Sequence, residues 1–373
     1  MSEETDRDQF SGATTHHPSP ITHHWTGLVP IACSCAALAV AFLGLLQLDQ
    51  PMTRYVRSVT VHVPGDQLIV PWMAFTSNTG DWIGNGWRLI GVSVVLLAAG
   101  WSFSRARLTQ SGIETALAHG LAALLSNGLK HLLGRPRPKF VHAGEWQLAP
   151  SLTSGLDSFP SGHTTATFAV ATVLAKRFPI TAPIVLGIAA FVGVSRVLRG
   201  SHFPTDVFAG MVLGVVSGSI AAAPWKEWRT SLEAGIVQAG IGAVGAFSLV
   251  WVLSQPADEG FTGTLFVAVG LLALAGGFWL RTRDFMQKAQ TAANGKISLA
   301  LIAYGLASMT TAPLVIASVG LMCLVGWFYN RPDQNEGPPV LPACRTIQEA
   351  VLAVGILLGL VLIFTGRGAF PFQ

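Results

Sequence analysis

The sequence predicts an all-α fold: a polytopic membrane protein whose helices cross the bilayer many times and pack as a bundle. Charged residues are scarce, since the 373-residue chain has only 23 Lys or Arg and 19 Asp or Glu, 11% of the total, whereas a soluble domain has about 25%. Hydrophobic residues make up 51%, and the mean hydropathy is +0.51. Such a chain cannot cover a water-facing surface and is too apolar to be disordered. The net charge of +4 is small and scattered, so we expect no nucleic-acid partner.

Apolar runs long enough to span a bilayer place the helices. The runs lie at 28–47, 86–103, 113–132, 162–176, 181–197, 205–223, 232–254, 261–280, 297–329 and 347–366. The run at 297–329 is too long for one ordinary span, and Pro313 is expected to split it into two short helices. We therefore expect nine to eleven spans.

A polar segment precedes the first of these runs. We expect residues 1–27 to form a disordered tail. Its two histidine pairs could bind metal, but no carboxylate or cysteine completes a site; these residues are His16, His17, His23 and His24. The four cysteines of the chain have no spacing typical of a zinc site or a disulfide framework, which favours a packing role.

Basic residues predict the orientation of the bundle. They gather in four short loops, which carry Arg105 and Arg107; Lys176 and Arg177; Lys226 and Arg229; and Arg281, Arg283, Lys288 and Lys296. All four loops fall on one side of the membrane if the spans alternate. Because cytoplasmic loops are enriched in Lys and Arg, we expect that side, and the amino terminus, to be cytoplasmic.

Three polar segments interrupt the apolar pattern at the ends of spans. They run from Lys130 to Pro138, from Phe159 to His163, and from Ser195 to Asp206. Alternating topology brings all three to the extracytoplasmic face. Charges at span ends that converge on one face are functional candidates.

The residues of these segments are suited to binding an anion. Asp206 is the only acid between Asp157 and Glu227, so we expect an electropositive cluster with a single carboxylate. Arginine offers bidentate donors to phosphate oxygens, and lysine offers a point charge. Ser161 before Gly162 is typical of a helix N-cap, where backbone N–H groups and the helix dipole add to an anion site. Nothing here supplies the paired carboxylates that Mg²⁺ usually needs, which indicates phosphoryl chemistry without a metal or another cofactor.

Two histidines could take different catalytic roles in such a site. His202 and Asp206 lie four residues apart, with Pro204 suited to the first turn of a helix. The carboxylate can then accept a hydrogen bond from one imidazole nitrogen and leave the other as a nucleophile. His163, at the start of another helix, could protonate the leaving oxygen. In-line attack would give a phosphohistidine, which water would attack in a second step.

The three motifs together resemble the type 2 phosphatidic acid phosphatase superfamily. The pattern comprises Lys130, Arg137 and Pro138; Pro160, Ser161, Gly162 and His163; and Ser195, Arg196, His202 and Asp206. The resemblance implies a six-helix lipid phosphatase core over residues 28–229, with additional membrane helices over 230–373. It makes His202 the nucleophile, Asp206 its partner and His163 the general acid. It implies that Lys130, Arg137, Ser161, Gly162 and Arg196 bind phosphate.

Other polar residues near the motifs are open to simpler interpretations. Arg135, Lys139 and Arg199 are equally well explained as interfacial residues whose charged ends reach lipid headgroups. The segment 76–82 either shapes the entrance of the site or forms an ordinary turn, and the turn is favoured. The loop residues Glu145, Trp146 and Asp157 belong either to a lid or to an ordinary exposed loop. His131 and His142 are expected to be structural or solvated, and His119 a hydrogen-bonded residue inside the bundle.

The resemblance and the chemistry together predict an integral membrane phosphatase that takes a lipid phosphate or diphosphate from the bilayer. Candidate substrates are undecaprenyl diphosphate, phosphatidylglycerol phosphate, phosphatidic acid and a lipid A phosphate, and in a bacterium the site would face the periplasm across the inner membrane. A lipid-to-lipid phosphotransferase using the same phosphohistidine is the alternative enzyme. A vanadium haloperoxidase shares the motifs, but the many spans argue against it. A non-catalytic lipid-binding or transport protein is the alternative outside enzymes. The oligomeric state is not predicted.

Overall fold

A computed structural model describes residues 20–59, 62–63, 67–68, 71–140, 150–153, 155–256, 258, 260–287, 292–328 and 342–369. His16, His17, His142, Glu145, Trp146 and most of the linker near residues 330–342 lie outside these ranges, and the side chains of His23 and His24 are not described either. The predictions for these residues therefore stay predictions.

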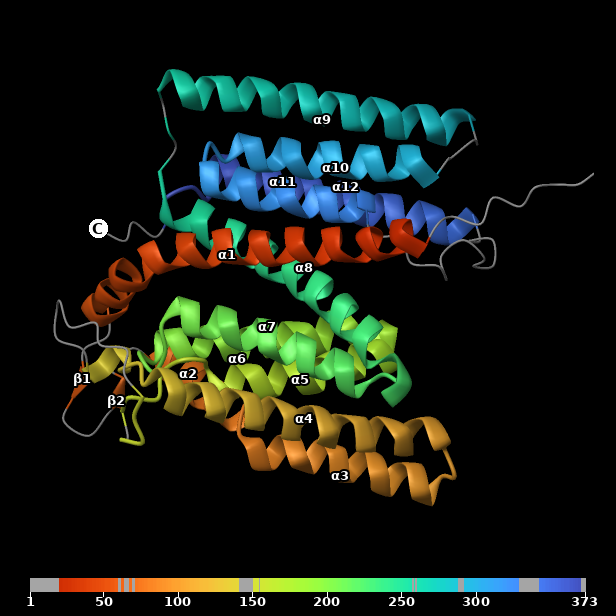
Figure 1. Cartoon of the computed structure of the whole chain (residues 1–373). Coiled ribbons are helices and arrows are strands. Elements are labelled where there is room, and N and C mark those ends of the chain that lie inside the picture. Colours follow the sequence, from red (N-terminus) through yellow and green to blue (C-terminus); the bar gives the residue numbers. More distant parts are fainter. Residues whose placement is uncertain are drawn as a thin grey trace, which may run out of the picture.

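The chain folds almost entirely into helices, which confirms the all-α prediction (Figure 1). The helices are α1 (Pro20–Val59), α2 (Pro71–Ile83), α3 (Gly86–Ser102), α4 (Ala106–Leu133), α5 (Gly162–Arg177), α6 (Ala182–Leu198), α7 (Pro204–Ala221), α8 (Trp228–Ser254), α9 (Phe261–Gln287), α10 (Ala292–Met309), α11 (Pro313–Phe328) and α12 (Pro342–Thr365). A small antiparallel hairpin, β1 (His62–Val63) and β2 (Gln67–Leu68), follows α1. Helix α1 begins at Pro20, inside the polar segment that was expected to be a tail.

Several of these helices are suited to cross a membrane, as a multi-pass membrane protein requires. In the described part of the chain, the stretches that are long and apolar enough are Leu28–Ser58, Pro179–Leu198, Pro204–Ala221, Trp228–Ser254 and Phe261–Arg283. Helices α2 and α3, bent by 50° against each other, would make a sixth as one broken span. By length and composition this is fewer than the nine to eleven expected, partly because two apolar helices, Pro313–Phe328 and Ala350–Thr365, are short.

Two predicted details of the helices have different outcomes. The apolar run at 297–329 does divide, because α10 ends at Met309 and α11 begins at Pro313. The segment 76–82, in contrast, is not a turn: it lies inside α2. Proline is tolerated at the first position of a helix but not in its interior, which explains the break before α11.

Small residues let α5 and α7 pack closely at the centre of the first half of the molecule. A Cβ atom built on Gly214 would lie 2.5 Å from the carbonyl oxygen of Thr165, and one on Gly218 equally near that of Ala169. Gly210 continues this stripe toward the start of α5, where a Cβ built on it would lie 2.8 Å from the carbonyl oxygen of Ser161. Such stripes allow helix backbones to approach within a bilayer, where apolar burial alone does not hold helices together.

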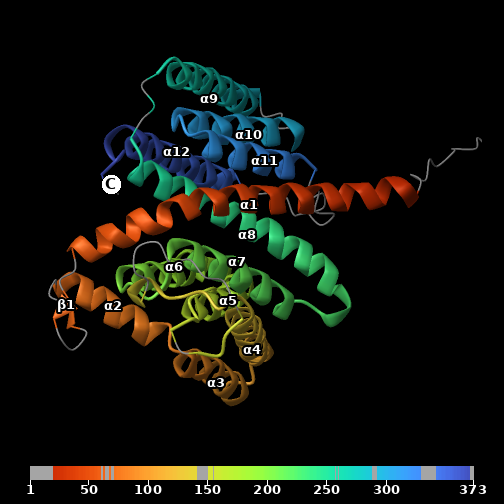
Figure 2. The same cartoon turned by 60° about the vertical axis from the view of Figure 1, so that its left-hand side comes forward.

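Helices α1 and α8 join the two halves of the molecule. In Figures 1 and 2 they run between α2–α7 on one side and α9–α12 on the other. One apolar cluster crosses this junction, with Leu45 and Leu48 from α1, Phe208 from α7, Phe247 from α8 and Val315 from α11. The division of the chain at residues 229 and 230 remains a prediction, and the packing shows that its two parts share a core.

The basic loops gather at one end of the bundle. Arg107 donates to the carbonyl oxygen of Arg177, and Arg177 donates in turn to that of Ala222, at 3.0 Å. Arg177 also pairs with Glu114. Three of the four basic loops therefore meet at the end that lies away from the polar motifs, in agreement with the alternation of the helices.

Candidate active site

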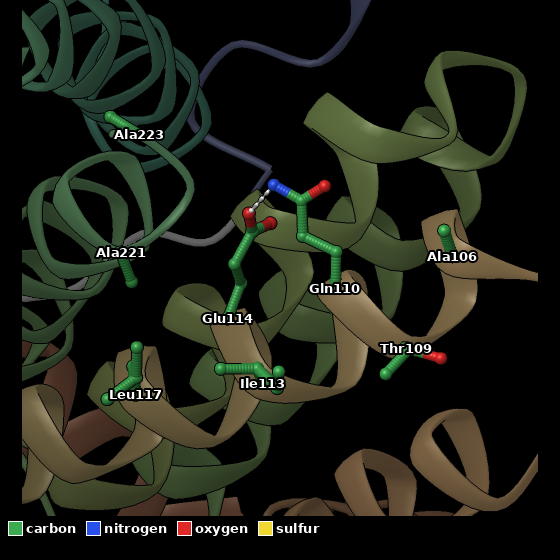
Figure 3. Close-up of a pocket in the computed structure, with 8 residues that line it drawn as sticks. All are labelled: Ala106, Thr109, Gln110, Ile113, Glu114, Leu117, Ala221 and Ala223. Atoms are coloured by element: carbon green, nitrogen blue, oxygen red, sulfur yellow. Dashed lines mark hydrogen bonds between the residues drawn. The ribbon is translucent and has the colours of Figure 1, made fainter. Parts of the chain in front are cut away.

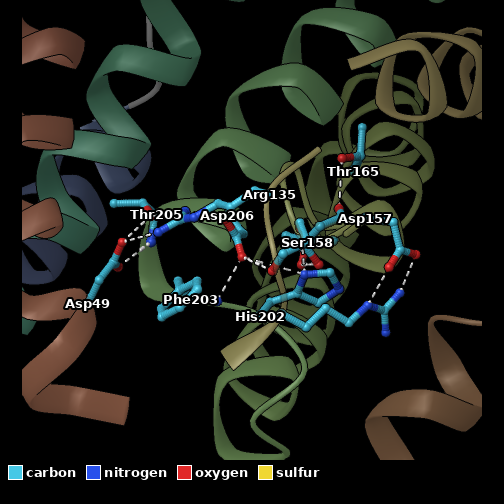
Figure 4. Close-up of polar contacts among 12 residues, drawn as sticks. Asp49, Arg135, Asp157, Ser158, Thr165, His202, Phe203, Thr205 and Asp206 are labelled. Carbon is cyan, nitrogen blue, oxygen red and sulfur yellow. Dashed lines mark hydrogen bonds and ion pairs between the residues drawn. The ribbon is translucent and has the colours of Figure 1, made fainter. Parts of the chain in front are cut away.

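The three polar motifs meet at the other end of the bundle, where α4 and α6 end and α5 and α7 begin. The backbone N–H of Ser161 donates to the carbonyl oxygen of Asp206 at 3.0 Å, and that of Ser158 donates to the carbonyl oxygen of Arg135 at 2.9 Å. The loop between α4 and α5 is thus tied to the start of α7. Segments that are far apart in the sequence form one polar cluster (Figure 4).

His202 is almost completely enclosed, as is its predicted partner Asp206. Its ring is 3% exposed, and Nδ1 donates to the carbonyl oxygen of Ser158 at 2.7 Å. Because a carbonyl can only accept, this bond fixes the proton on Nδ1 and leaves Nε2 with a lone pair. Burial lowers the pKa of His202 below its ordinary value of 6.5, although the nearby carboxylate of Asp206 acts in the opposite direction.

Asp206 does not make the hydrogen bond to His202 that the four-residue spacing suggested. Its Oδ2 atom lies 3.7 Å from Nδ1 of His202, beyond hydrogen-bond range. The carboxylate instead accepts from the hydroxyl of Ser158 at 2.5 Å, from the backbone N–H of Phe203 at 2.8 Å, and from Arg135. Ser158, which sequence reasoning missed, therefore contacts both residues and mediates between them.

Arg135 lies in the interior and not at the membrane interface, so the interfacial interpretation was wrong for this residue. Its side chain is 3% exposed and lies between two buried carboxylates, those of Asp49 and Asp206 (Figure 4). Nη2 bonds to Asp49 at 2.7 Å, and the guanidinium lies over the ring of Phe203, 4.2 Å from its centroid. Arg135 thus links α1 to α7.

Arg137, the predicted phosphate ligand of the first motif, is held by Asp157. Its Nε and Nη2 atoms donate to the two carboxylate oxygens at 2.8 and 2.6 Å. Burial alone would raise the pKa of Asp157, but the hydrogen bonds and charge of Arg137 outweigh it and hold the pKa below its ordinary value. Asp157 is therefore more than an unremarkable exposed loop residue, because it fixes the guanidinium of Arg137.

Arg196 and His163 share a second carboxylate, that of Asp81 on α2. Nη1 of Arg196 lies 2.5 Å from Oδ1 of Asp81, and Nε2 of His163 lies 3.4 Å from the same oxygen. Arg199 reaches the other oxygen at 3.0 Å. Gly80 makes this possible, because a Cβ there would lie 1.9 Å from the hydroxyl of Ser195 and would keep α2 away from α6.

Lys130, Ser161 and Gly162 lie together where α4 meets α5. A Cβ on Gly162 would approach Nζ of Lys130 to 3.4 Å. Ser161 occupies the N-cap position of α5, as predicted, but its hydroxyl makes no capping hydrogen bond and accepts from Thr164 at 2.9 Å.

The charge balance of the cluster differs from the expected single carboxylate. Asp49, Asp81 and Asp157 join Asp206, and each of the four pairs with an arginine. Asp49 and Asp81 were missed because they are distant in sequence from their arginines, and Asp157 was named only as a loop residue. A phosphate that reaches Arg137 and Arg196 would share them with Asp157 and Asp81.

Two further observations concern metal binding and a surface hollow. Across the part of the chain that the structure describes, no three His, Cys, Asp or Glu residues are grouped so as to hold a metal ion. An open hollow of about 570 Å³ lies at the basic end of the bundle, lined by Ala106, Thr109, Gln110, Ile113, Glu114, Leu117, Ala221 and Ala223 (Figure 3). It is remote from the histidines, so it is not the candidate active site.

His131 and His119 lie outside this polar cluster's hydrogen bonds and ion pairs. Nδ1 of His131 lies 3.2 Å from the carbonyl oxygen of Ser151, on an exposed side chain, in keeping with a structural or solvated residue. Nδ1 of His119 is buried without a hydrogen-bond partner, so the expected hydrogen bond inside the bundle is not formed by that atom.

Fold and site define a membrane-embedded helical protein with a histidine pair enclosed by ion-paired arginines. Residues 112–229 match the family model described as the PAP2 superfamily, so the chain carries a PAP2 superfamily domain of the membrane type. This confirms the resemblance seen in the motifs. All eight predicted site residues lie within the match, whereas Asp49 and Asp81 lie outside it.

Three relatives are named as phosphatases. Lipid A 1-phosphatase of Rhizobium johnstonii is 40% identical over 95 residues, 25% of this chain and 39% of the relative. Lipid A 1-phosphatase of Rhizobium etli is 29% identical over 49% of this chain and 79% of the relative. Phosphatidylglycerophosphatase B of Bacillus subtilis is 36% identical over 33% of this chain and 61% of the relative. The chain thus spans less than two thirds of the first and third of these proteins.

Proposed function

We propose that this protein is a membrane phosphatase that hydrolyses a phosphomonoester or diphosphate of a lipid through a phosphohistidine on His202. The observation that carries the proposal is the placement of His202: the ring is buried, and the Ser158 carbonyl holds the Nδ1 proton at 2.7 Å. Nε2 is then unprotonated and available for attack. The charges of Lys130 and Arg137 act on His202, and those of Lys130 and Arg196 act on His163.

In the proposed mechanism the reaction has two steps. Nε2 of His202 attacks phosphorus in line, the bond from phosphorus to the lipid oxygen breaks, and His163 donates a proton to that oxygen. His163 then takes a proton from a water molecule, which attacks the phosphohistidine and releases inorganic phosphate. Lys130, Arg137 and Arg196 stabilise the negative charge on the equatorial oxygens throughout.

Fixed positions for these cations support the proposal. Asp157 orients Arg137 through two hydrogen bonds, and Asp81 orients Arg196 through one. Donors that are held in place before the substrate arrives need no reorganisation during the reaction. We propose that they take the part that a metal ion plays in other phosphoryl-transfer sites, so that turnover continues in EDTA.

The place of the site in the bundle supports a lipid substrate. The cluster lies at helix ends, where a headgroup can enter from the interface while its acyl or isoprenyl chain stays in the bilayer. The basic loops lie at the opposite end, so the positive-inside rule puts the site on the extracytoplasmic face and the amino terminus in the cytoplasm. In a bacterium this would be the periplasmic face of the inner membrane.

The lipid itself is proposed from the relatives. Candidates are a lipid A phosphate, phosphatidylglycerol phosphate, undecaprenyl diphosphate and phosphatidic acid. The names of the two Rhizobium proteins favour a lipid A phosphate, and that of the Bacillus protein favours phosphatidylglycerol phosphate. The motifs bind the phosphoryl group that all four share.

The experiment that tests the proposal offers this panel of lipid phosphates to the purified protein in detergent with EDTA. Release of inorganic phosphate without an acceptor lipid is the expected result, with kcat/KM ranking the lipids. His202→Ala should lower kcat by about 10⁴-fold or more, since loss of a nucleophile or its base has effects of that order.

Other outcomes identify the alternatives. Release only when a second lipid is added would show a phosphotransferase. An absolute requirement for Mg²⁺ would rule out the metal-free mechanism, and full activity of His202→Ala would rule out the nucleophile. Binding of lipid phosphates without turnover would leave a binding or transport protein.

A further inference from the structure

Asp49 on α1 is a carboxylate placed where a membrane helix has little reason to carry one. Its side chain is completely buried, and Leu45 and Leu48 beside it belong to the apolar cluster between the two halves. A buried charge is costly in such surroundings unless it is paired. A residue with only a packing role at this position would be apolar.

All the hydrogen-bond partners of the Asp49 carboxylate lead to the candidate active site. Oδ2 accepts from Nη2 of Arg135 at 2.7 Å and from the hydroxyl of Thr205 at 2.5 Å. Oδ1 accepts from the backbone N–H of Thr205 at 3.1 Å. Thr205 is the second residue of α7, so a carboxylate from another helix holds the first turn of α7 and is favoured there by the helix dipole.

Arg135 carries this connection to the catalytic histidine. Its Nη1 atom bonds to Asp206 and, at 2.7 Å, to the hydroxyl of Thr205. Asp206 accepts from the hydroxyl of Ser158, whose carbonyl oxygen accepts from Nδ1 of His202. Figure 4 shows the order of the contacts: Asp49, Arg135, Asp206, Ser158 and His202.

The far side of α1 is held by the half of the chain without a motif. A Cβ on Gly44 would lie 2.5 Å from Cε2 of Phe247 in α8, so α1 and α8 are in close contact one turn before Asp49. Val315 of α11 joins the same cluster. The C-terminal helices therefore pack against α1, the helix that carries Asp49 to the site.

We propose that Asp49 is a positioning residue for the proposed phosphatase reaction, on which this inference rests. Through Arg135 and Thr205 it fixes the start of α7 and the carboxylate of Asp206, and so sets the direction in which Nε2 of His202 points. It touches no substrate. The phosphate ligands Lys130, Arg137 and Arg196 have no contact with it among the hydrogen bonds and ion pairs of the described residues.

The test compares Asp49→Asn with Ser34→Ala. The first removes a charge while keeping the shape of the side chain; the second removes a buried α1 hydroxyl that has no hydrogen-bond partner. We expect Asp49→Asn to lower kcat by about 10- to 100-fold, because displacement of a reacting group by about 1 Å has effects of this size. KM and inhibition by vanadate should change by less than about threefold, because uniform binding is left intact. Ser34→Ala should match the wild type.

The possible results test the role of Asp49 and the proposed function separately. Wild-type kcat in Asp49→Asn would overturn the inference, as would a rise in KM at constant kcat. An equal loss in Ser34→Ala would show that any change in the interior of α1 matters. A wild-type protein without phosphatase activity would instead overturn the proposed function.

A second variant covers the case in which Asp49→Asn does not fold. Thr205→Val removes only the hydroxyl that joins Asp49 to Arg135 and keeps the backbone N–H that Asp49 accepts. It should lower kcat by about 3- to 10-fold without raising KM, as expected for a smaller displacement of the same group. An unchanged kcat in Thr205→Val would overturn the inference.

Discussion

The two halves of this protein bury different kinds of polar residue. From α1 to α7, the buried side chains include five that carry a formal charge, and the histidine His202; the five are Asp49, Glu114, Arg135, Arg196 and Asp206. From α8 to α12, over the described residues, the buried polar side chains are only serines and threonines: Ser254, Ser298, Ser308, Thr310, Thr311 and Ser318. Both halves contain helices long and apolar enough to cross a membrane, so the membrane alone does not explain the contrast.

Local hydrogen bonds satisfy most of the buried polar residues of the second half, although the Ser308 hydroxyl has no partner. Ser254, Ser298, Thr310 and Ser318 donate to carbonyl oxygens three residues earlier in the chain, at 2.6 to 3.1 Å. Such local bonds need no partner on another helix. A charged residue at the bilayer centre costs about 2.5 to 3.5 kcal/mol on insertion scales. Four of the five buried charges of the first half lie in ion pairs of the candidate active site, and Glu114 pairs with Arg177 at the basic end.

Removing one arginine from each half tests the difference between the halves most directly. Arg135→Leu leaves Asp49 and Asp206 buried without their shared cation, and loss of one partner of a buried pair costs about 3 to 5 kcal/mol. We expect thermal unfolding in detergent to move to a clearly lower temperature, and kcat to fall about 100-fold as His202 loses its support.

Arg367 is the matched control in the second half. It donates to the carbonyl oxygen of Met309 at 3.3 Å and to the hydroxyl of Thr311 at 3.2 Å, where α10 ends. Arg367→Leu should cost about 1 to 3 kcal/mol of stability, as for other hydrogen bonds to charged groups, and leave kcat within about twofold. Equal losses of activity in both variants would show that the halves do not differ in function.

The sequence could predict which residues of the first half gather at the candidate site, because their signal is local. Lys130, His163 and His202 each belong to a motif at the end of an apolar run, and alternation of the spans brings these ends to one face. The fold class follows equally from composition and from the length of the runs. These predictions need no knowledge of which helices touch.

The carboxylates that complete the site could not be found in this way. Asp49 lies 86 residues from Arg135, and Asp81 lies 115 residues from Arg196. Apolar periodicity says which residues form a helix and nothing about which distant side chain faces them. Asp49 also falls just after the first apolar run, and Asp81 in a segment rich in turn-forming residues. Such residues favour turns locally, but the packing of α2 against α6 through Gly80 overrides that preference.

Close helix packing offers a second test, because both halves use glycine for it. A Cβ on Gly214 would meet the carbonyl oxygen of Thr165 in α5 at 2.5 Å, and one on Gly277 would meet that of Ser298 in α10 at 3.0 Å. Valine at either position should destabilise the protein by about 1 to 3 kcal/mol, as overpacking does.

Only the variant in the first half should also affect catalysis. Helices α5 and α7 start with the motifs that carry His163 and Asp206, so Gly214→Val should lower kcat/KM by about tenfold through displacement of these groups. Gly277→Val should leave kcat/KM within about twofold. The contrast is measured by thermal unfolding and phosphate release on the same detergent samples. A tenfold loss in Gly277→Val would mean that α9 and α10 contribute to the site.

The smallest expected effect is in the pH profile, and it too separates the halves. All ten histidines lie at or before His202. Imidazole side chains, whose ordinary pKa is near neutral, are therefore confined to the first half. His202 must be neutral to attack, and burial lowers its pKa below 6.5. As the pH falls, kcat/KM should therefore stay high through 6.5 and drop only below it.

The lowered pKa of His202 also makes the free energy of unfolding depend on pH. Below pH 6.5 the unfolded chain binds a proton on this histidine while the folded chain does not, so the free energy of unfolding should decrease as the pH falls toward the folded-state pKa. His202→Ala should remove that part of the pH dependence, while Arg367→Leu should keep it. If the acidic limb of kcat/KM lies at or above pH 6.5 in the wild type, His202 is exposed to water during turnover. The enclosed ring held by Ser158 would then not be the form that attacks phosphorus.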